Sequence, residues 1–551
     1  MHFKDCLIHG TLALTFLLAA CKTSTDRPII PGQPAAVQSP AMPPSAPAAP
    51  EAPVPPTETP IPFEPARVPR TEPRLPGIFS HNMVLQQGAS VPLWGWADDG
   101  DTVTVTFRDQ RVSTVAKNGR WLVKLKPLKA GGPDTLTISN GKPLQLTNVL
   151  VGEVWVCSGQ SNMDWPMKKA FQPDADIAAA TNSQIRLFKV PKVKADVPQD
   201  NVEASWEVSS PDLVKDFSAV AYYFGRDLQA ARTVPVGLIQ TSWGGSPAEV
   251  WMSRDVLENN PRYKAEILGA YPEAHENFKR ALAGFEEQKA LALKQKKEFK
   301  QLPPRPVWKP SELYNGMIAP LIPYAIKGAI WYQGESNAGR AEQYRTLFAD
   351  MIRNWRRDWK QGDFPFLTTQ LAPFKPIKPQ PEDSDWAELR EAQLLSTKVL
   401  PNAGIAVITD VGEEHDIHPT KKAPVGARLA LAARGIAYGE RLVYSGPVFK
   451  TMKVKDGKAI LSFDHVGSGL EARGGALKGF SIGGPAGKFL WALGEIQPDN
   501  TVTVWSPNVP QPTAVRFGWA DYPVVNLWNR EGLPASPFRT DNFPMITAGK
   551  K

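Results

Sequence analysis

Hydrophobic and polar residues alternate in short runs between residues 75 and 150 of this chain. The run Thr102–Phe107 reads TVTVTF, and a second alternating run follows at 111–116. Period-two alternation is typical of strands that bury one face. Asn118 and Gly119 then form a pair that favours a two-residue hairpin turn. The pattern predicts a β-sandwich domain over residues 75–150.

The pattern changes between residues 151 and 438, where short, continuously apolar runs alternate with helical periodicity. Four of these runs are expected to be strands: 149–156, 234–239, 327–332 and 404–409. Buried apolar strands that alternate with helices are typical of a parallel sheet with helices on both faces. A stretch rich in Ala, Glu and Lys at about 260–301 predicts a helical insertion. We therefore expect an α/β domain over residues 151–438.

Strand patterns return from residue 439 to residue 551, for example at 459–463 and 501–505. These runs predict a C-terminal β domain. The chain has 551 residues, which exceeds the size at which one hydrophobic core stops growing, so several domains are expected on length alone.

The first 20 residues have the pattern of an export signal. An apolar run at 11–20 is too short to span a bilayer stably. It ends in Leu-Ala-Ala-Cys at 18–21, which resembles the bacterial lipobox, where the cysteine thiol takes a diacylglyceryl group. We expect cleavage before Cys21, lipidation of this residue, and anchoring to the bacterial cell envelope on the periplasmic or the outer side. The alternative is an ordinary secretory signal with a chance cysteine.

Residues 21–74 are expected to form a disordered tether. Sixteen of the 54 prolines of the chain lie between Lys22 and Arg74, where large apolar residues are rare. Such a segment cannot offset its ordering entropy by burial. Proline favours extended polyproline II, so the tether would let the folded part stand away from the membrane.

Overall composition excludes several classes of protein. With 42% hydrophobic and 21% charged residues, the chain is neither fibrous, wholly disordered nor a multi-spanning membrane protein. The formal charge of +8 is small for this length, and the lysine-rich run at 289–300 lacks the interleaved aromatic residues and the motif context of nucleic-acid binding. We expect no nucleic-acid partner. Three cysteines exclude a disulfide framework.

Candidate chemistry lies directly after the predicted central strands, where ligands of open α/β sheets bind. The first such segment, CSGQSNM at 157–163, presents Ser161 as a candidate nucleophile, with a helix cap as the alternative. The next, TSWGGSP at 241–247, has glycines that allow close backbone approach to a ligand, although a plain tight turn has the same composition.

A third segment places amide side chains at a strand end. Gln333 and Asn337 carry N–H donors for a developing oxyanion, or they satisfy backbone groups as isolated amides usually do. Glu335 is either a structural hydrogen-bond partner or a pocket wall.

The fourth segment contains Asp416 and His418. Residues at i and i+2 of an extended segment point to the same side, so the carboxylate can fix the tautomer of the imidazole. Alternatives are a metal site that includes His415 and a purely structural loop. A serine, a glycine turn, side-chain amides and Asp-x-His in this order favour a hydrolase site above a sheet. The serine context lacks the second glycine of Gly-x-Ser-x-Gly, which disfavours an α/β-hydrolase.

With these motifs, the chain resembles the sialate O-acetylesterase family, a branch of the SGNH hydrolases. The resemblance covers roughly residues 75–543 and is strongest at GEVWVCSGQSNMDWPM, GLIQTSWGGSPAEVWMS, LYNGMIAPLIPYAIKGAIWYQGESN and DIHP. It implies a flavodoxin-like three-layer SGNH hydrolase domain with flanking β domains, and no metal or organic cofactor.

Carried over by motif, the resemblance implies that Ser161 is the nucleophile, His418 the general base and Asp416 its orienting acid. The implied oxyanion hole is formed by Ser161, Gly245, Gln333 and Asn337, and the implied pocket includes Gln160 and Glu335. Gln333 and Asn337 cannot both be assigned the same role from the sequence. The broader SGNH pattern, Asp-x-x-His, would place the acid at position 415, which is a histidine here.

The function implied by this resemblance is a carbohydrate O-acetylesterase that removes acetyl groups from sialic acid or related glycans through an acetyl-enzyme. An acetylxylan esterase is the alternative within this class. A non-catalytic, lipid-tethered glycan-binding protein is the alternative from another class.

Overall fold

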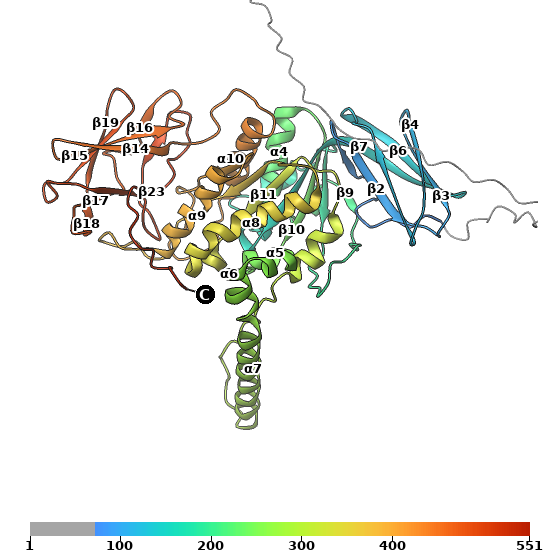
Figure 1. The fold of residues 1–551 in the computed structure, drawn as a ribbon, viewed down its shortest axis with the longest axis horizontal. Helices are drawn as coiled ribbons and strands as arrows, with labels where there is room; N and C mark the ends of the chain where they lie inside the picture. The colour runs from blue at the N-terminus through green and yellow to red at the C-terminus, as the bar shows by residue number, and fades with distance from the viewer. Residues whose placement is uncertain (1–71, 551) are drawn as a thin grey trace, which may run out of the picture. The chain divides into compact units, whose positions relative to one another are not determined.

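The computed structural model describes residues 72–550 (Figure 1). The predicted export signal, Cys21 and all but the last three residues of the predicted tether lie outside the described residues. Within the described part of the chain, every helix is too short or too polar to cross a membrane.

The first part is a β-sandwich. Its strands are β1 (Val84–Gln86), β2 (Val91–Trp96), β3 (Thr102–Phe107), β4 (Gln110–Val115), β5 (Arg120–Leu125), β6 (Gly131–Ser139) and β7 (Pro143–Gly159). β2 pairs with β5, and the other strands form a second sheet. Asn118 and Gly119 have φ angles of 53° and 70°, as the predicted hairpin turn requires. Apolar residues of both sheets share one buried core.

Strand β7 connects the sandwich to the central sheet. Its first part pairs antiparallel with β6 over residues 143–151, and its second part pairs in parallel with two central strands over residues 153–159. The predicted domain boundary between residues 150 and 151 therefore falls inside one continuous strand. The buried core of the sandwich also continues into one face of the central domain.

The central sheet adds β8 (Ile185–Lys189), β9 (Trp206–Val208), β10 (Val236–Ser242), β11 (Gly328–Tyr332), β12 (Phe366–Thr369) and β13 (Ala403–Ala406). The strand order is β13-β12-β11-β7-β10-β8-β9, and all neighbours are parallel except β8 and β9. When the two edge strands β8 and β9 are set aside, the remaining five strands have the order 2-1-3-4-5. This order is typical of a doubly wound sheet of the flavodoxin type.

Two pairs of long helices cover this sheet. Helices α4 (Ala219–Arg232) and α10 (Ala423–Ile436) lie on one face, and α8 (Ala341–Trp359) and α9 (Asp385–Val399) lie on the other (Figure 1). A Cβ atom at Gly426 would lie 2.5 Å from the Cβ of Tyr223, so this glycine allows α10 to approach α4 closely. The central part therefore has three layers, as the apolar pattern predicts.

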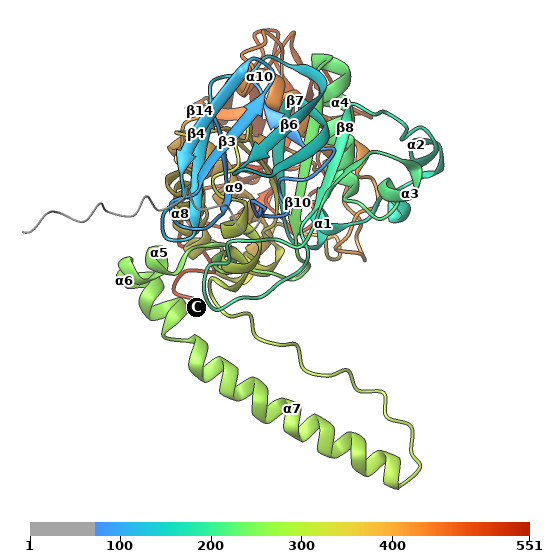
Figure 2. The same cartoon turned by 90° about the vertical axis from the view of Figure 1, so that its right-hand side faces the viewer.

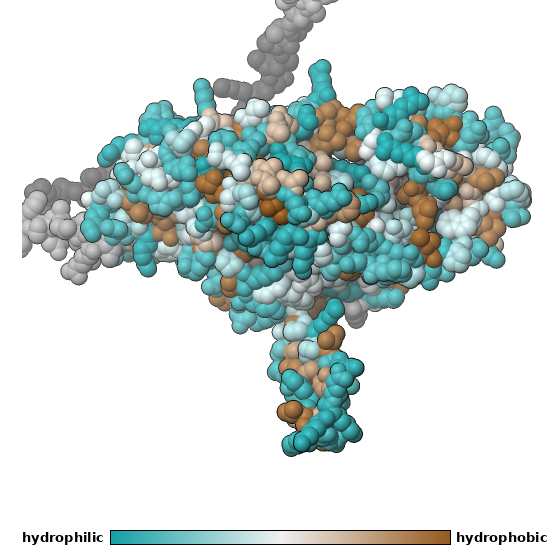
Figure 3. Space-filling model, turned by 180° about the vertical axis from the view of Figure 1, so that it is seen from behind, coloured by the Kyte–Doolittle hydropathy of each residue, from teal (hydrophilic) through white to brown (hydrophobic). Residues whose placement is uncertain are grey.

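Shorter helical segments occupy the connections. They are α1 (Ser161–Asp164), η1 (Met167–Lys169), α2 (Asp174–Ala178), α3 (Pro211–Val214), η2 (Ala248–Trp251), α5 (Arg254–Asn259), α6 (Pro261–Tyr263), η3 (Lys264–Leu268), η4 (Tyr314–Ile318), η5 (Ala319–Leu321) and η6 (Glu335–Arg340). The predicted helical stretch at 260–301 contains α7 (Tyr271–Lys294), which projects from the central part (Figures 1 and 2). None of its residues is buried, and its surface is mainly hydrophilic (Figure 3).

The C-terminal part is built from short β-strands: β14 (Val448–Lys455), β15 (Lys458–Asp464), β16 (Leu470–Ala472), β17 (Phe480–Gly483), β18 (Phe489–Trp491), β19 (Leu493–Ile496), β20 (Val502–Trp505), β21 (Ala514–Phe517), β22 (Leu527–Asn529) and β23 (Phe538–Arg539). Two four-stranded antiparallel sheets, β14-β15-β20-β19 and β18-β17-β21-β23, enclose a core of their own.

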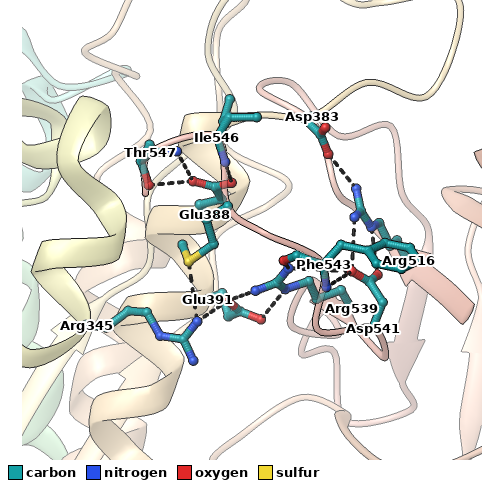
Figure 4. Close-up of polar contacts among 11 residues, drawn as sticks. Arg345, Asp383, Glu388, Glu391, Arg516, Arg539, Asp541, Phe543, Ile546 and Thr547 are labelled. Carbon is teal, nitrogen blue, oxygen red and sulfur yellow. Dashed lines mark hydrogen bonds and ion pairs between the residues drawn. The ribbon is translucent and has the colours of Figure 1, made fainter. Parts of the chain in front are cut away.

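The end of the chain binds the C-terminal part to helix α9 (Figure 4). The buried carboxylate of Glu388 accepts hydrogen bonds from the main-chain N–H groups of Ile546 and Thr547, at 2.6 and 3.1 Å, and from the Thr547 hydroxyl at 2.6 Å. Beside it, Arg539 forms an ion pair with Glu391 at 2.9 Å. Because charged groups with several hydrogen bonds hold one geometry, these contacts fix the β part against the central helices.

Candidate active site

Three neighbouring strands of the central sheet end at the same edge. Gly159 at the end of β7 lies opposite Ser242 of β10 on one side and opposite Tyr332 of β11 on the other. The segments that follow these strands therefore emerge side by side. This is the edge at which doubly wound sheets bind ligands.

The candidate nucleophile Ser161 follows a tight turn that only glycine permits. Gly159 has a φ angle of +140°, and a Cβ atom there would lie 2.1 Å from the carbonyl oxygen of Tyr332. The Gln160 N–H donates to the Tyr332 carbonyl at 3.0 Å, and the Trp243 N–H donates to the Gly159 carbonyl at 3.0 Å. The turn is therefore fixed by both neighbouring strands, and it places Ser161 at the first position of α1.

Ser161, His418 and Asp416 come together as the sequence predicts. The Ser161 Oγ lies 2.8 Å from the His418 Nε2, and the His418 Nδ1 lies 3.3 Å from the Asp416 Oδ1. The same carboxylate oxygen accepts the main-chain N–H of His418 at 2.8 Å. A carboxylate at Nδ1 favours the tautomer with its proton on Nδ1, which leaves Nε2 free to accept the serine proton.

The surroundings of His418 favour its neutral form. The indole of Trp165 stacks on the imidazole with a centroid distance of 5.2 Å and an interplanar angle of 19°. Burial lowers the pKa of His418, the charges of Lys422 and Lys169 lower it further, and Asp416 opposes this shift. A neutral imidazole is the form that a general base requires.

A buried amide connects three of the segments at this edge. The Asn162 Nδ2 donates to the Glu335 Oε1 at 2.6 Å and to the carbonyl of Ile417 at 3.0 Å, and the Asn162 Oδ1 accepts from the Lys422 Nζ. Asn162 follows the nucleophile directly, whereas Ile417 lies between the acid and the base. This side chain therefore ties the turn that carries Ser161 to the segment that carries His418.

The two charged partners of Asn162 lie in the protein interior. Burial lowers the pKa of Lys422 to about 7, against the opposing attraction of Glu335 and other carboxylates. Burial likewise raises the pKa of Glu335, whose Oε2 has no hydrogen-bond partner among the described residues. From the sequence, we expected Glu335 to be either a structural hydrogen-bond partner or a pocket wall. Its contact with Asn162 favours the first role.

The predicted pocket residue Gln160 also has a structural contact. Its side chain is 3% exposed, and its Oε1 accepts the N–H groups of Ser336 at 3.2 Å and Gly334 at 3.5 Å. Gln160 therefore holds the segment after β11 in place beneath the site.

The hydrogen bonds of Gln333 and Asn337 differ from the prediction that these amides donate to an oxyanion. The Gln333 Nε2 donates to the Asn337 Oδ1 at 2.6 Å and to the Ser246 carbonyl at 3.3 Å. The Asn337 Nδ2 donates to Glu249 at 3.0 Å, and both amide residues are buried. Since both hydrogens of the Gln333 amide are occupied, this geometry does not support that role; the amides order the turn after β10 instead.

The glycine turn after β10 supplies main-chain donors beside the nucleophile. A Cβ atom at Gly244 would lie 3.2 Å from the Ser161 Cβ, and Gly245 has a φ angle of +77°. Within residues 72–550, no hydrogen-bond acceptor is present for the N–H groups of Gly244 and Gly245. From the sequence, we placed Gly245, but not Gly244, in the implied oxyanion hole. The adjacent glycines at 244 and 245 were the signal that could have pointed to both.

A groove with a cationic lining lies beside α1. It has a volume of about 680 Å³, and its lining includes four lysines and two aspartates: Lys168, Lys169, Lys189, Lys192, Asp164 and Asp216. The ammonium group of Lys169 lies 5.5 Å from the ring centre of Trp165, which stacks on the imidazole of His418. In the described part of the chain, no cluster of three or more His, Cys, Asp or Glu side chains is arranged to hold a metal ion.

This chain is similar to known carbohydrate esterases. A family model described as carbohydrate esterase, sialic acid-specific acetylesterase, matches residues 305–434. The sialate O-acetylesterase of Mus musculus is 31% identical over 438 residues, which are 71% of this chain and 79% of that protein. The human sialate O-acetylesterase is 30% identical over 436 residues, covering 71% and 76% of the two chains.

A solved structure is also similar. The crystal structure of a carbohydrate acetylesterase from Xanthomonas citri has a TM-score of 0.74 and 41% sequence identity to this chain. The match covers 86% of this chain and all of that chain.

The environment of His418 generates a prediction that NMR titration can check. We expect the imidazole of His418 to titrate below its ordinary value of about 6.5, and Asp416→Asn to lower its pKa further, because the carboxylate stabilises the charged form. His465, whose pKa is also lowered by burial, is the control and should not respond to Asp416→Asn. A rise in the pKa of His418 in this variant would contradict the geometry.

Proposed function

This chain belongs to the sialate O-acetylesterase family, and we propose that it is a serine esterase that removes O-acetyl groups from sialic acid or related acetylated glycans. The observation that carries this proposal is the 2.8 Å contact between the Ser161 Oγ and the His418 Nε2 at the ligand-binding edge of the sheet. Ser161 acts as the nucleophile, His418 as the general base and Asp416 as the acid that orients it.

The first chemical step is acylation of the serine. The His418 Nε2 takes the hydroxyl proton while the Ser161 Oγ forms a bond to the acetyl carbonyl carbon. The resulting oxyanion is bound by the N–H groups of Ser161, Gly244 and Gly245. The bond between this carbon and the sugar oxygen then breaks, and the sugar oxygen takes the proton from His418. Losing one oxyanion donor typically costs about a hundredfold or more in rate.

The second step returns the enzyme to its starting state. His418 takes a proton from water as the water oxygen attacks the acetyl carbon. The bond to the Ser161 Oγ breaks, the serine oxygen recovers its proton from His418, and acetic acid leaves, which releases its own proton to solvent and becomes acetate. Both steps require one imidazole to accept and return a proton, which is why its neutral form at rest favours turnover.

We further infer that the central part is an SGNH hydrolase domain over residues 151–438, flanked by a β-sandwich over 75–150 and a β domain over 439–551. The 2-1-3-4-5 order of five central strands supports this assignment. The separate core of the C-terminal part supports the second boundary.

Charge in the groove beside α1 favours an anionic sugar over neutral xylan. Two of the four lysines of the groove have carboxylate partners: Lys168 pairs with Asp216 and Lys192 with Asp164, each at 2.6 Å. Lys169 has no carboxylate partner among the described residues and lies on the Trp165 side. A net positive groove attracts the carboxylate of a sialic acid, whereas xylan carries no such charge.

Replacing the nucleophile tests the mechanism. Ser161→Ala is expected to lower kcat on 4-nitrophenyl acetate by about 10⁴-fold or more, because neither nucleophile nor acyl-enzyme remains. Ser183→Ala, an exposed serine near β8, is the matched control and should retain full activity. Turnover unchanged in Ser161→Ala would remove this residue from the mechanism. Glycan binding without turnover in the wild type would favour a binding protein.

A substrate panel tests the anionic sugar. We expect faster acetate release from O-acetylated sialic acid than from acetylxylan, and a rate on sialic acid that falls as salt screens the lysines. Lys169→Gln should raise KM for the sialic acid and leave KM for 4-nitrophenyl acetate unchanged, both measured at a pH well above the pKa of His418, because Lys169 also lowers that pKa. Faster acetate release from acetylxylan than from sialic acid, at a rate that salt does not change, would favour acetylxylan as the substrate.

We also propose that the mature chain is a lipoprotein of the bacterial cell envelope, anchored through Cys21. The lipobox-like sequence at 18–21 and the proline-rich segment behind it support this. Cys21→Ser should release the chain from membranes, as measured by fractionation. Cys6→Ser, which changes a cysteine upstream of the lipobox, is the control and should leave the chain attached. Membrane association unchanged in Cys21→Ser would contradict the proposal.

A further inference from the structure

A cavity of about 360 Å³ lies between the segment that links β12 to α9 and the C-terminal β domain. Its volume falls within the range of small-molecule sites. The C-terminal β domain supplies apolar walls that include Leu477, Phe480 and Trp519, whereas Lys378, Gln380 and Glu382 of the β12–α9 segment supply polar groups. The site described above uses none of these residues.

This cavity adjoins the segment that carries the catalytic acid and base. Two of its lining residues contact that segment directly: the Tyr522 hydroxyl donates to the Gly412 carbonyl at 3.3 Å, and the Ile377 N–H donates to the Glu414 carboxylate at 3.0 Å. Glu414 precedes Asp416 by two residues, so the lining of the cavity contacts the same chain segment that carries Asp416 and His418. The β12–α9 segment also starts at the edge of the sheet where the triad assembles.

Trp491 presents an accessible ring in this cavity. Its side chain is 45% exposed although it is one of the largest apolar groups of the domain. The indole N–H donates to the Pro379 carbonyl at 2.8 Å, and pairing of β18 with β17 holds its main chain. Asp383, another lining residue, is held by Arg516 at 2.8 Å (Figure 4). The ring is therefore fixed before any ligand arrives, which lowers the entropic cost of binding.

We propose that this cavity binds a sugar residue of the substrate glycan that neighbours the acetylated sugar. The inference rests on the proposed function. A pyranose ring has an apolar C–H face, which stacks on an aromatic ring, and a rim of hydroxyl groups. The Trp491 indole matches the face, and the Gln380 amide and the Lys378–Glu382 ion pair match the hydroxyls. The triad thus cleaves the ester while the cavity selects glycans of more than one sugar.

The test compares substrates of different length. In Trp491→Ala, kcat/KM on an O-acetylated sialyl trisaccharide should fall roughly tenfold, mainly through KM. The same variant should retain wild-type rates on O-acetylated sialic acid and on 4-nitrophenyl acetate. Trp491→Phe, which keeps an aromatic face, should recover most of the loss. Leu493→Ala is the matched control, because Leu493 is 55% exposed and lies outside the cavity.

Two outcomes would overturn the proposal: an unchanged kcat/KM on the trisaccharide, or an equal loss on all three substrates. Calorimetric binding of the deacetylated trisaccharide to Ser161→Ala, with and without Trp491→Ala, separates the subsite from the chemistry. Binding that depends on Trp491, without hydrolysis of any ester by the wild type, would retain the subsite and reject the esterase. Ester hydrolysis by the wild type, with trisaccharide binding that does not depend on Trp491, would retain the esterase and reject the subsite.

Discussion

The geometry of the active site depends on the buried side chain of Asn162. Its amide binds one oxygen of the Glu335 carboxylate, the ammonium of Lys422 and the carbonyl of Ile417 at once. Each of these groups would be costly to bury without a partner, since an unsatisfied polar group in the interior costs about 1–3 kcal/mol and a charge costs more. The nucleophile turn and the histidine segment therefore share one network, and neither can move without breaking contacts of the other.

Strand β7 extends this rigidity to the other side of the nucleophile. The same strand belongs to the β-sandwich at its start and ends at the turn of Ser161. The buried apolar cluster of the sandwich continues past this strand to helix α8. The sandwich thus acts as a support for the nucleophile, while the C-terminal domain contacts the histidine segment through Tyr522. The flanking domains hold opposite halves of the triad.

The sequence was sufficient to predict that Ser161, Asp416 and His418 come together. All three residues follow strand ends, and strand ends converge at one edge of a parallel sheet. The sequence did not show the partners of Gln333, because side-chain amides after a strand satisfy any nearby buried group, and Gln333 donates to partners inside the fold. Gly244 was missed because a main-chain donor leaves only a turn signal. Strands β8, β9 and β12 were not predicted, and β8 carries Arg186 and Lys189 within its apolar run.

Lys422 shows why the electrostatics of the site could not be predicted from the sequence pattern. This lysine begins the helical segment after the histidine, where a surface cation would be the default reading, yet it is 1% exposed and lies 5.3 Å from the ring centre of Tyr332. Its burial lowers its pKa to about 7. The charge of Lys422 lowers the pKa of His418, because two positive charges repel each other. A charged Lys422 therefore helps to keep the imidazole of His418 neutral.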